Sequence, residues 1–232
     1  MPNSGYKFGA DPIGSKMTPS DVKYIAVEGV IGVGKSTLSK ILAERYAARL
    51  LPEIFEENPF LEKFYSDQKA YAFQTQLFFL LSRHKQIKES FDQEDLFVKC
   101  TVSDYCYDKD RIFASINLSE EEMMMYDTLS QNLNVNLVSP DYVIFLQASP
   151  DVLLHRIEKR NRSMEQNMDP GYLKALIDSY NSYFFNYNDA PVLTVNTDSI
   201  DFVKNESDLL DLLKVIDGFP PGKTFYNPST LL

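Results

Sequence analysis

Short apolar runs alternate along the chain with stretches in which apolar residues recur every three or four positions. Residues 24–28 (Tyr-Ile-Ala-Val-Glu) form one such run, which ends at Gly29 and is typical of a strand buried on both faces. The same criteria predict strands at residues 101–103, continuing from 96–98, at residues 142–146 and 192–195, and more weakly at residues 51–55.

The stretches between these runs predict helices. In the first of them, Leu38, Ile41 and Leu42 fall on one face of a helix that begins at Ser36. By this criterion helices are predicted at residues 36–50, 70–91, 120–133, 150–159 and 171–187. Strands that alternate with helices indicate an α/β domain with a parallel sheet covered by helices on both faces.

The organisation of the chain favours one domain over residues 21–217, because its 232 residues contain no repeat and no convincing linker. Residues 1–20 are rich in Pro, Gly and Ser and are expected to form a flexible tail, since they have no apolar segment of the signal-peptide kind. Residues 218–232 contain several prolines and are expected to be irregular.

Composition narrows the possible partners and location. The net charge of −10 argues against a general basic surface for nucleic acid. The longest apolar run, at residues 77–81, is too short to cross a bilayer. Cys100 and Cys106 have no metal-site or disulfide spacing and are expected to be reduced thiols. A cytoplasmic protein that binds neither nucleic acid nor membrane is therefore expected.

Residues 29–36 (Gly-Val-Ile-Gly-Val-Gly-Lys-Ser) match the phosphate-binding pattern G-x-x-x-x-G-K-[ST] between a predicted strand and a predicted helix. Glycines allow the backbone N–H groups to curl around phosphate oxygens. Lys35 is expected to contact the β- and γ-phosphates and Ser36 to offer its hydroxyl to Mg²⁺. The residues expected to bind a nucleoside triphosphate here are Gly29, Gly32, Val33, Gly34, Lys35, Ser36 and Thr37.

A cluster of cations ends the predicted helix at residues 150–159. Arg156 and Arg160 lie four residues apart on one helical face, and Arg162 follows them. Near a P-loop, such a cluster is expected to form a lid that neutralises charge on a transferring phosphoryl group. The alternative is a solvated helix end, where the helix dipole also favours cations.

Polar residues on three other predicted elements are candidates for binding a phosphoryl acceptor. Glu53 lies at the second predicted strand, where a carboxylate can accept a proton from an attacking hydroxyl, although a surface acid is the default for a glutamate. Asp104 ends a strand and is a candidate ligand of Mg²⁺, directly or through water, or a helix cap. Gln76 and Arg83 share a helix face that suits the edge of a nucleobase, or a solvent-facing polar stripe.

Taken together, several blocks resemble the deoxynucleoside kinase family, in particular its bacterial deoxyadenosine/deoxyguanosine kinase branch. The resemblance covers residues from about 24 to 211 and is specific because the blocks occur in the family's order. They are residues 28–37, 57–61 with 64–65, 71–76, 103–105 with 112–114, 156–162, and 165.

The resemblance implies a five-stranded parallel sheet of the P-loop kinase fold with an Arg-rich lid, and a homodimer that packs helices together. It implies transfer of the γ-phosphoryl group of ATP, with Mg²⁺, to the 5′-hydroxyl of a small-molecule deoxynucleoside in nucleotide salvage, with a purine favoured. Catalysis is assigned to Glu53, the general base, with Lys35 and Arg160. The other assignments are Gln76, Arg83 and Asp110 for the base, Tyr65 and Glu165 for the 3′-hydroxyl, and Arg156, Arg160 and Arg162 for the lid.

One block departs from the family pattern. Where the family often has Asp/Glu-Arg-Ser, this chain has Asp104, Tyr105 and Cys106, so the arginine beside the 5′-hydroxyl is missing. Lys109 and Arg111 are the candidates to replace its charge. Two other readings stay open: a nucleoside monophosphate kinase of the thymidylate kinase type, and a nucleotide-binding module without catalysis.

Overall fold

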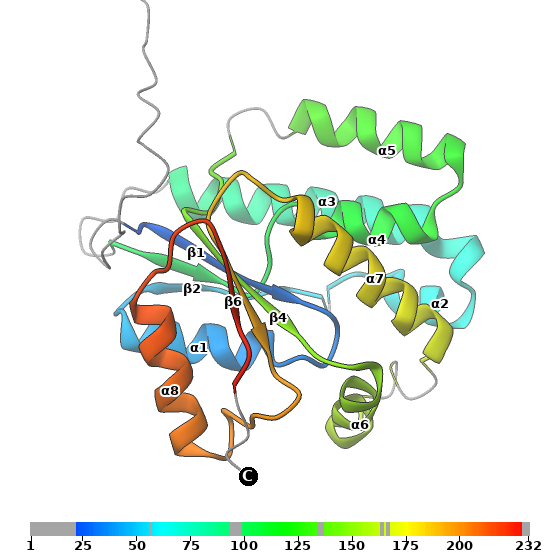
Figure 1. The fold of residues 1–232 in the computed structure, drawn as a ribbon. Coiled ribbons are helices and arrows are strands. Elements are labelled where there is room, and N and C mark those ends of the chain that lie inside the picture. The colour runs from blue at the N-terminus through cyan, green and yellow to red at the C-terminus, as the bar shows by residue number, and fades with distance from the viewer. Residues whose placement is uncertain are drawn as a thin grey trace, which may run out of the picture.

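The apolar runs of the sequence form the centre of a parallel sheet (Figure 1). A computed structural model describes residues 22–55, 57–92, 99–133, 137–162, 165 and 168–228. In these residues the sheet has six strands in the order β2-β3-β1-β4-β5-β6, and every neighbouring pair is parallel. The strands are β1 (Tyr24–Gly29), β2 (Arg49–Leu51), β3 (Thr101–Ser103), β4 (Tyr142–Gln147), β5 (Val192–Asn196) and β6 (Lys223–Tyr226).

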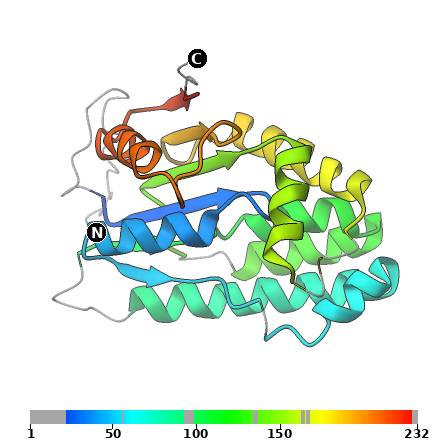
Figure 2. The same cartoon turned by 90° about the horizontal axis from the view of Figure 1, so that it is seen from below.

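Helices cover both faces of this sheet (Figures 1 and 2). One face carries α1 (Lys35–Arg45) and α8 (Glu206–Asp217), and the other carries α3 (Gln68–Asp92), α4 (Lys109–Asn117) and α7 (Pro170–Asn186). Outside this second layer lies α5 (Glu120–Leu133), while α2 (Leu61–Ser66) precedes α3. Beyond the carboxyl ends of the strands lies α6 (Pro150–Arg160).

The core lies between the central strands and these helices. Every residue of β1 is buried, and Phe145 of β4 stacks on Phe184 of α7 with their ring centroids 4.4 Å apart. On the other face, Leu38 and Leu42 of α1 are completely buried. Burial on both faces explains why β1 and β4 read as continuous apolar runs instead of alternating patterns. No helix within the described ranges is long and apolar enough to span a bilayer.

The sheet differs from the expected five strands by one edge strand. The tail at residues 218–232 was expected to be irregular, but Lys223–Tyr226 pairs with β5 as β6. Its residues alternate between exposed and half-buried, as at a sheet edge, and the prolines before it masked this pattern in the sequence. The predicted tail at residues 1–20 and the run at 96–98 lie outside the described residues.

The first predicted helix was too long. It was expected to continue to residue 50, but α1 ends at Arg45, and Ala47 adopts a left-handed conformation with φ 49°. Residues Arg49–Leu51 then pair with β3 as β2, earlier than the predicted strand at residues 51–55. The turn contains neither Gly nor Pro, so Leu50 continued the helical periodicity of the sequence without a stop signal.

Candidate active site

The phosphate loop connects the carboxyl end of β1 to the first turn of α1. Gly29, Gly32 and Gly34 have φ values of 148°, 88° and 108°, which L side chains rarely adopt. A Cβ atom on Gly34 would lie 2.8 Å from the ring of Phe202, and one on Gly29 would lie 2.4 Å from the carbonyl oxygen of Leu146. The sequence therefore folds here into a strand, a glycine turn and a helix N-terminus, the geometry that holds phosphates.

Lys35 is folded back onto this loop. Its Nζ donates to the carbonyl oxygens of Gly29 at 2.8 Å and Val30 at 3.2 Å. The pKa of its ammonium is lowered from 10.5 to about 8, mainly by burial and then by the like charge of Lys109. Neutral carbonyls are weak partners for a half-buried cation, so a triphosphate would replace them readily.

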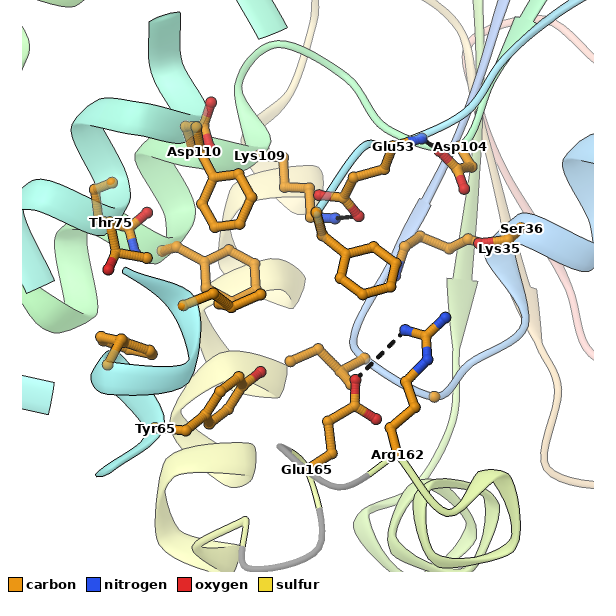
Figure 3. A pocket seen from close by; sticks show the side chains of 18 of the residues that line it. Lys35, Ser36, Glu53, Tyr65, Thr75, Asp104, Lys109, Asp110, Arg162 and Glu165 are labelled. Atoms are coloured by element: carbon orange, nitrogen blue, oxygen red, sulfur yellow. Dashed lines mark hydrogen bonds and ion pairs between the residues drawn. The ribbon is translucent and has the colours of Figure 1, made fainter. Parts of the chain in front are cut away.

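A cavity opens beside the loop at the carboxyl edge of the sheet (Figure 3). The predicted site residues that line it are Gly32, Lys35, Ser36, Glu53, Tyr65, Gln76, Arg83, Asp104, Asp110, Arg160, Arg162 and Glu165. They come from the P-loop, from the segments after β2 and β3, from α2, α3 and α4, and from the lid. The remaining predicted P-loop residues, Gly29, Val33, Gly34 and Thr37, shape the loop and α1 without lining the cavity.

Glu53 is held by two cations at the floor of this cavity. Lys109 Nζ lies 2.5 Å from its Oε2, and Arg83 forms an ion pair with its Oε1. The backbone N–H of Glu53 donates to Asp104 Oδ1 at 2.5 Å, which fixes the residue to the end of β3. Burial alone would raise the pKa of the Glu53 carboxyl, but the charges of Lys109 and Arg83 outweigh it and hold this pKa well below 4.5.

Arg83 connects this carboxylate to a second one. Its guanidinium also forms an ion pair with Asp110 of α4, and it packs against the ring of Phe79 at 4.9 Å. The Oε1 atom of Gln76, the Oδ2 atom of Asp110 and the Nε atom of Arg83 are buried without a hydrogen-bond partner. Buried polar atoms without partners are costly, and here they line the cavity, where a bound molecule could satisfy them.

Residues after α6 form the opposite wall. The helix ends at Asn161, which is left-handed with φ 55°. Arg160 forms an ion pair with Glu165, and Arg162 Nη1 lies 3.6 Å from the same carboxylate. Figure 3 shows Glu165 and Tyr65 directed into the same part of the cavity. The lid arginines are thus arranged around a single buried acid.

Arg156 differs from its expected place in the lid. Its guanidinium donates to Thr197 Oγ1 at 2.9 Å, to the Thr197 carbonyl oxygen at 2.8 Å and to the Val33 carbonyl oxygen at 3.4 Å. It does not line the cavity. One helical turn before Arg160, the side chain meets the P-loop and the segment after β5, so it anchors these two segments to each other.

The position of the missing family arginine is occupied by a tyrosine that does not line the cavity. Tyr105 is fully buried, and its hydroxyl donates to Gln86 Oε1 at 2.6 Å. Of the two candidates to replace the charge, Arg111 instead pairs with Asp127 at 3.0 Å on the surface. Lys109 is the cation that reaches Glu53.

Oxygen ligands for Mg²⁺ are available beside Lys35. Ser36 and Asp104 both line the cavity there (Figure 3), and hydroxyl and carboxylate oxygens suit this ion. The described residues contain no group of three or more His, Cys, Asp or Glu side chains placed to hold a metal. The two oxygens fit an ion that takes its other ligands from nucleotide phosphates and water.

Some residues around the cavity were not predicted from the sequence. Glu28 is completely buried, and its carboxylate accepts from the N–H groups of Gly29 at 3.0 Å and Cys106 at 2.8 Å. It therefore joins the start of the P-loop to the turn after β3. The unpredicted apolar wall consists of Ile31, Phe55, Leu61, Phe64, Phe79 and Phe113. Their residue chemistry alone gave only apolar character, which core residues share, although several lie in the blocks that resemble the family.

A P-loop, a largely buried carboxylate and a cluster of arginines around one cavity are features of a P-loop phosphotransferase. A family model described as "Deoxynucleoside kinase" matches residues 25–219. The chain belongs to this family, and it is a kinase that phosphorylates nucleosides.

Individual relatives agree with this assignment. The chain is 39% identical over 189 residues to the deoxyguanosine kinase of Bacillus subtilis (strain 168). This alignment covers 80% of this chain and 91% of that protein. It is 32% identical over 210 residues to the deoxyadenosine kinase of Lactobacillus acidophilus, covering 84% and 95%. The structure of deoxyadenosine kinase from M. mycoides with bound dATP superimposes with a TM-score of 0.72 at 27% identity, covering 84% of this chain and 99% of that one.

Proposed function

We propose that this kinase transfers the γ-phosphoryl group of ATP to the 5′-hydroxyl of a purine deoxynucleoside in nucleotide salvage. The observation that carries the proposal is the buried Glu53 carboxylate, which shares one cavity with Lys35 and Ser36 of the P-loop. A hydroxyl acceptor placed between them would have a base on one side and a triphosphate on the other. The names of the relatives, which are kinases of deoxyguanosine and deoxyadenosine, support a purine acceptor.

Glu53 is the proposed general base. The 5′-hydroxyl proton passes to its carboxylate as the oxygen attacks the γ-phosphorus. In the free protein Lys109 and Arg83 lower its pKa, which makes it a weak base. Its basicity rises when these cations also interact with the acceptor oxygen and the phosphates, since each then contributes less to holding the carboxylate ionised.

Gln76, Arg83 and Asp110 are the proposed readers of the base. An amide, a guanidinium and a carboxylate together supply donors and acceptors for the N7 and six-position groups of a purine. The rings of Phe79 and Phe113 in the same cavity offer apolar faces to a planar base.

The remaining site residues bind the sugar and the nucleotide. Tyr65 and Glu165 hold the 3′-hydroxyl, while Arg160 and Arg162 neutralise the transferring group. Ser36 and Asp104 would hold Mg²⁺, which would supply charge neutralisation of the phosphates. Arg156 contributes to ATP binding by fixing the P-loop and not by lid contact, because its guanidinium is used by Thr197 and Val33.

A substrate panel tests the proposed acceptor. With ATP and Mg²⁺, kcat/KM is expected to be at least about 10-fold higher for deoxyguanosine or deoxyadenosine than for deoxycytidine or thymidine. A thymidine preference would remove the purine assignment while leaving the reaction class in place. Asp110→Asn keeps the shape of this side chain but removes its charge. It should reduce the difference in kcat/KM between purine and pyrimidine deoxynucleosides.

Arg160→Ala is expected to lower kcat by roughly 10²-fold, which is typical when one charge-stabilising group is lost. The reason is that Arg160 lines the same cavity as Lys35 and Ser36 of the P-loop, where its charge would stabilise the transferring phosphoryl group. Steady-state kinetics with ATP as the varied substrate measures the effect. Arg45→Ala is the control, because Arg45 pairs with Asp217 on the surface. A normal kcat with only a raised KM for ATP would show that Arg160 contributes to ATP binding and not to stabilisation of the transition state.

Binding of ATP should take up a proton in mildly alkaline solution. Lys35 has a pKa of about 8 in the free protein, and the charges of a bound triphosphate raise it. The affinity for ATP is therefore highest below about pH 8 and falls as the pH rises above this value. Calorimetry at about pH 9 in two buffers of different ionisation enthalpy measures the uptake. In Lys35→Arg, whose cation stays charged, the uptake should disappear; equal uptake by both proteins would assign the proton elsewhere.

We also propose a cytoplasmic homodimer. The neighbouring helices α3 and α5 expose Leu81, Met124 and Met125, with 48%, 65% and 57% of their surface accessible, and the family resemblance implies helix packing between subunits. Light scattering of the purified protein tests this assembly: a dimer is expected, and Met124→Glu with Met125→Glu should produce monomers.

A further inference from the structure

Lys109 is an unusual lysine, because its side chain is almost completely buried. It is the first residue of α4, and only 6% of the side chain is exposed. Lysine is seldom buried unless its charge is paired. Glu53 provides that pairing at 2.5 Å, and the ring of Phe113, one helical turn further along α4, lies 6.0 Å from the ammonium. The ammonium therefore lies at the floor of the cavity and not in solvent.

The turn after β3 explains why the ammonium group of Lys109 lies beside Glu53. Tyr105 directs its ring into the core, against the Arg83 guanidinium at 5.5 Å, and bonds Gln86. Tyr105 is neutral and does not line the cavity, so position 105 supplies no charge there. The N–H of Lys109 then bonds the Cys106 carbonyl oxygen at 3.2 Å, which closes the turn and begins α4 with Lys109 facing Glu53.

Lys109 also lies close enough to the P-loop for its charge to affect the pKa of Lys35. Its charge is the second largest cause of the lowered pKa of Lys35, after burial. Both lysines line the same cavity, and Figure 3 shows them on either side of the Glu53 carboxylate. The space between them is where an acceptor oxygen and a γ-phosphoryl group would meet.

We infer that Lys109 is a catalytic residue that replaces the arginine missing from the Asp104-Tyr105-Cys106 turn, an inference that rests on the proposed function. In the free enzyme it holds Glu53. In the complex with both substrates its ammonium contacts the 5′-oxygen and the transferring phosphoryl group. The O5′–Pγ bond forms and the bond from Pγ to the β-phosphate oxygen breaks. The 5′-hydroxyl proton goes to Glu53, ADP leaves with the electron pair, and Lys109 keeps its proton throughout.

Charge and shape at this position are separated by two variants. Lys109→Met keeps the aliphatic stem and removes the charge, and it is expected to lower kcat on deoxyguanosine or deoxyadenosine by about 10²-fold. Lys109→Arg keeps the charge and should retain at least about a tenth of the wild-type kcat. Arg111→Met is the matched control, since Arg111 lies on the same helix but pairs with Asp127 at the surface.

The pH profile tests the charge coupling between Lys109 and Glu53, which a lysine that only fills space would not provide. Without the charge of Lys109 the pKa of Glu53 rises, so the acidic limb of kcat/KM in Lys109→Met should move to higher pH. Circular dichroism checks that the variants are folded. If Lys109→Met is folded and its kcat lies within about threefold of the wild type, the inference is wrong. A low kcat in both variants with an unmoved acidic limb also overturns it.

Restoring the family arginine gives an independent check. Tyr105→Arg should be neutral or harmful to kcat, because Lys109 already supplies the charge and Tyr105 holds Gln86. A large gain in kcat would show that nothing supplies it and would overturn the inference. A wild-type enzyme that phosphorylates no deoxynucleoside would instead refute the proposed function, whatever the variants do.

Discussion

Replacing Glu53 by glutamine is expected to lower kcat on deoxyadenosine or deoxyguanosine by at least about 10²-fold, within the range for loss of a general base. The amide keeps the shape of the side chain but cannot accept the proton of the attacking hydroxyl. Nucleoside binding should change much less, because the amide still bonds the hydroxyl. Single-turnover phosphorylation and equilibrium binding, measured on the same preparation, separate these two effects.

Glu57→Gln is the control for this variant, because Glu57 is an exposed neighbour. Glu53→Gln also leaves Lys109 and Arg83 opposite a neutral group, so the melting temperature should fall. That loss must be measured, since unfolded protein would imitate a catalytic defect. A folded Glu53→Gln enzyme with undiminished kcat would remove Glu53 from the chemistry.

Lys35→Ala is expected to abolish phosphoryl transfer while leaving the fold intact. Among the residues that the structure describes, the lysine has no ion-pair partner, and its ammonium donates to the carbonyl oxygens of Gly29 and Val30. Its removal therefore breaks no charge pair and relieves the burial that lowers its pKa. We expect a melting temperature at or above that of the wild type and no measurable turnover.

Lys40→Ala, at an exposed position of the same helix, should behave like the wild type. Circular dichroism and a coupled assay for ADP formation suffice for the comparison. Retained activity in a folded Lys35→Ala protein would contradict the role of the P-loop in this enzyme.

The strands that the sequence predicted well are those buried on both faces. β1, β4 and β5 are continuous apolar runs, and the structure confirms them. β6 was missed because an edge strand of four residues carries little apolar signal beside Pro220 and Pro221. α4 was missed because it has nine residues and buries Lys109 and Asp110, which a pattern of apolar positions treats as polar surface.

Site residues that belong to a contiguous motif could be predicted from the sequence more easily than residues that the fold brings together from distant segments. The P-loop is contiguous, so it was identified from the motif alone. Glu53 could not be chosen over Glu56 or Glu57 from residue chemistry, because its distinction is a pairing with Lys109 and Arg83 from other helices. Arg156 was predicted to belong to the lid because it shares a helix face with Arg160. Residue spacing does not show which neighbouring segments each of these side chains contacts. The roles of these residues in catalysis remain predictions.

The most direct test of the account uses wild-type enzyme, ATP and two kinds of acceptor. Deoxyadenosine and deoxyguanosine are compared with their 5′-monophosphates, and the products are separated by chromatography. The negative charge of Glu53 opposes an acceptor phosphate beside it. We predict formation of deoxynucleoside monophosphates and almost no diphosphate. Efficient conversion of a monophosphate to a diphosphate, unaffected by Glu53→Gln, would contradict the account.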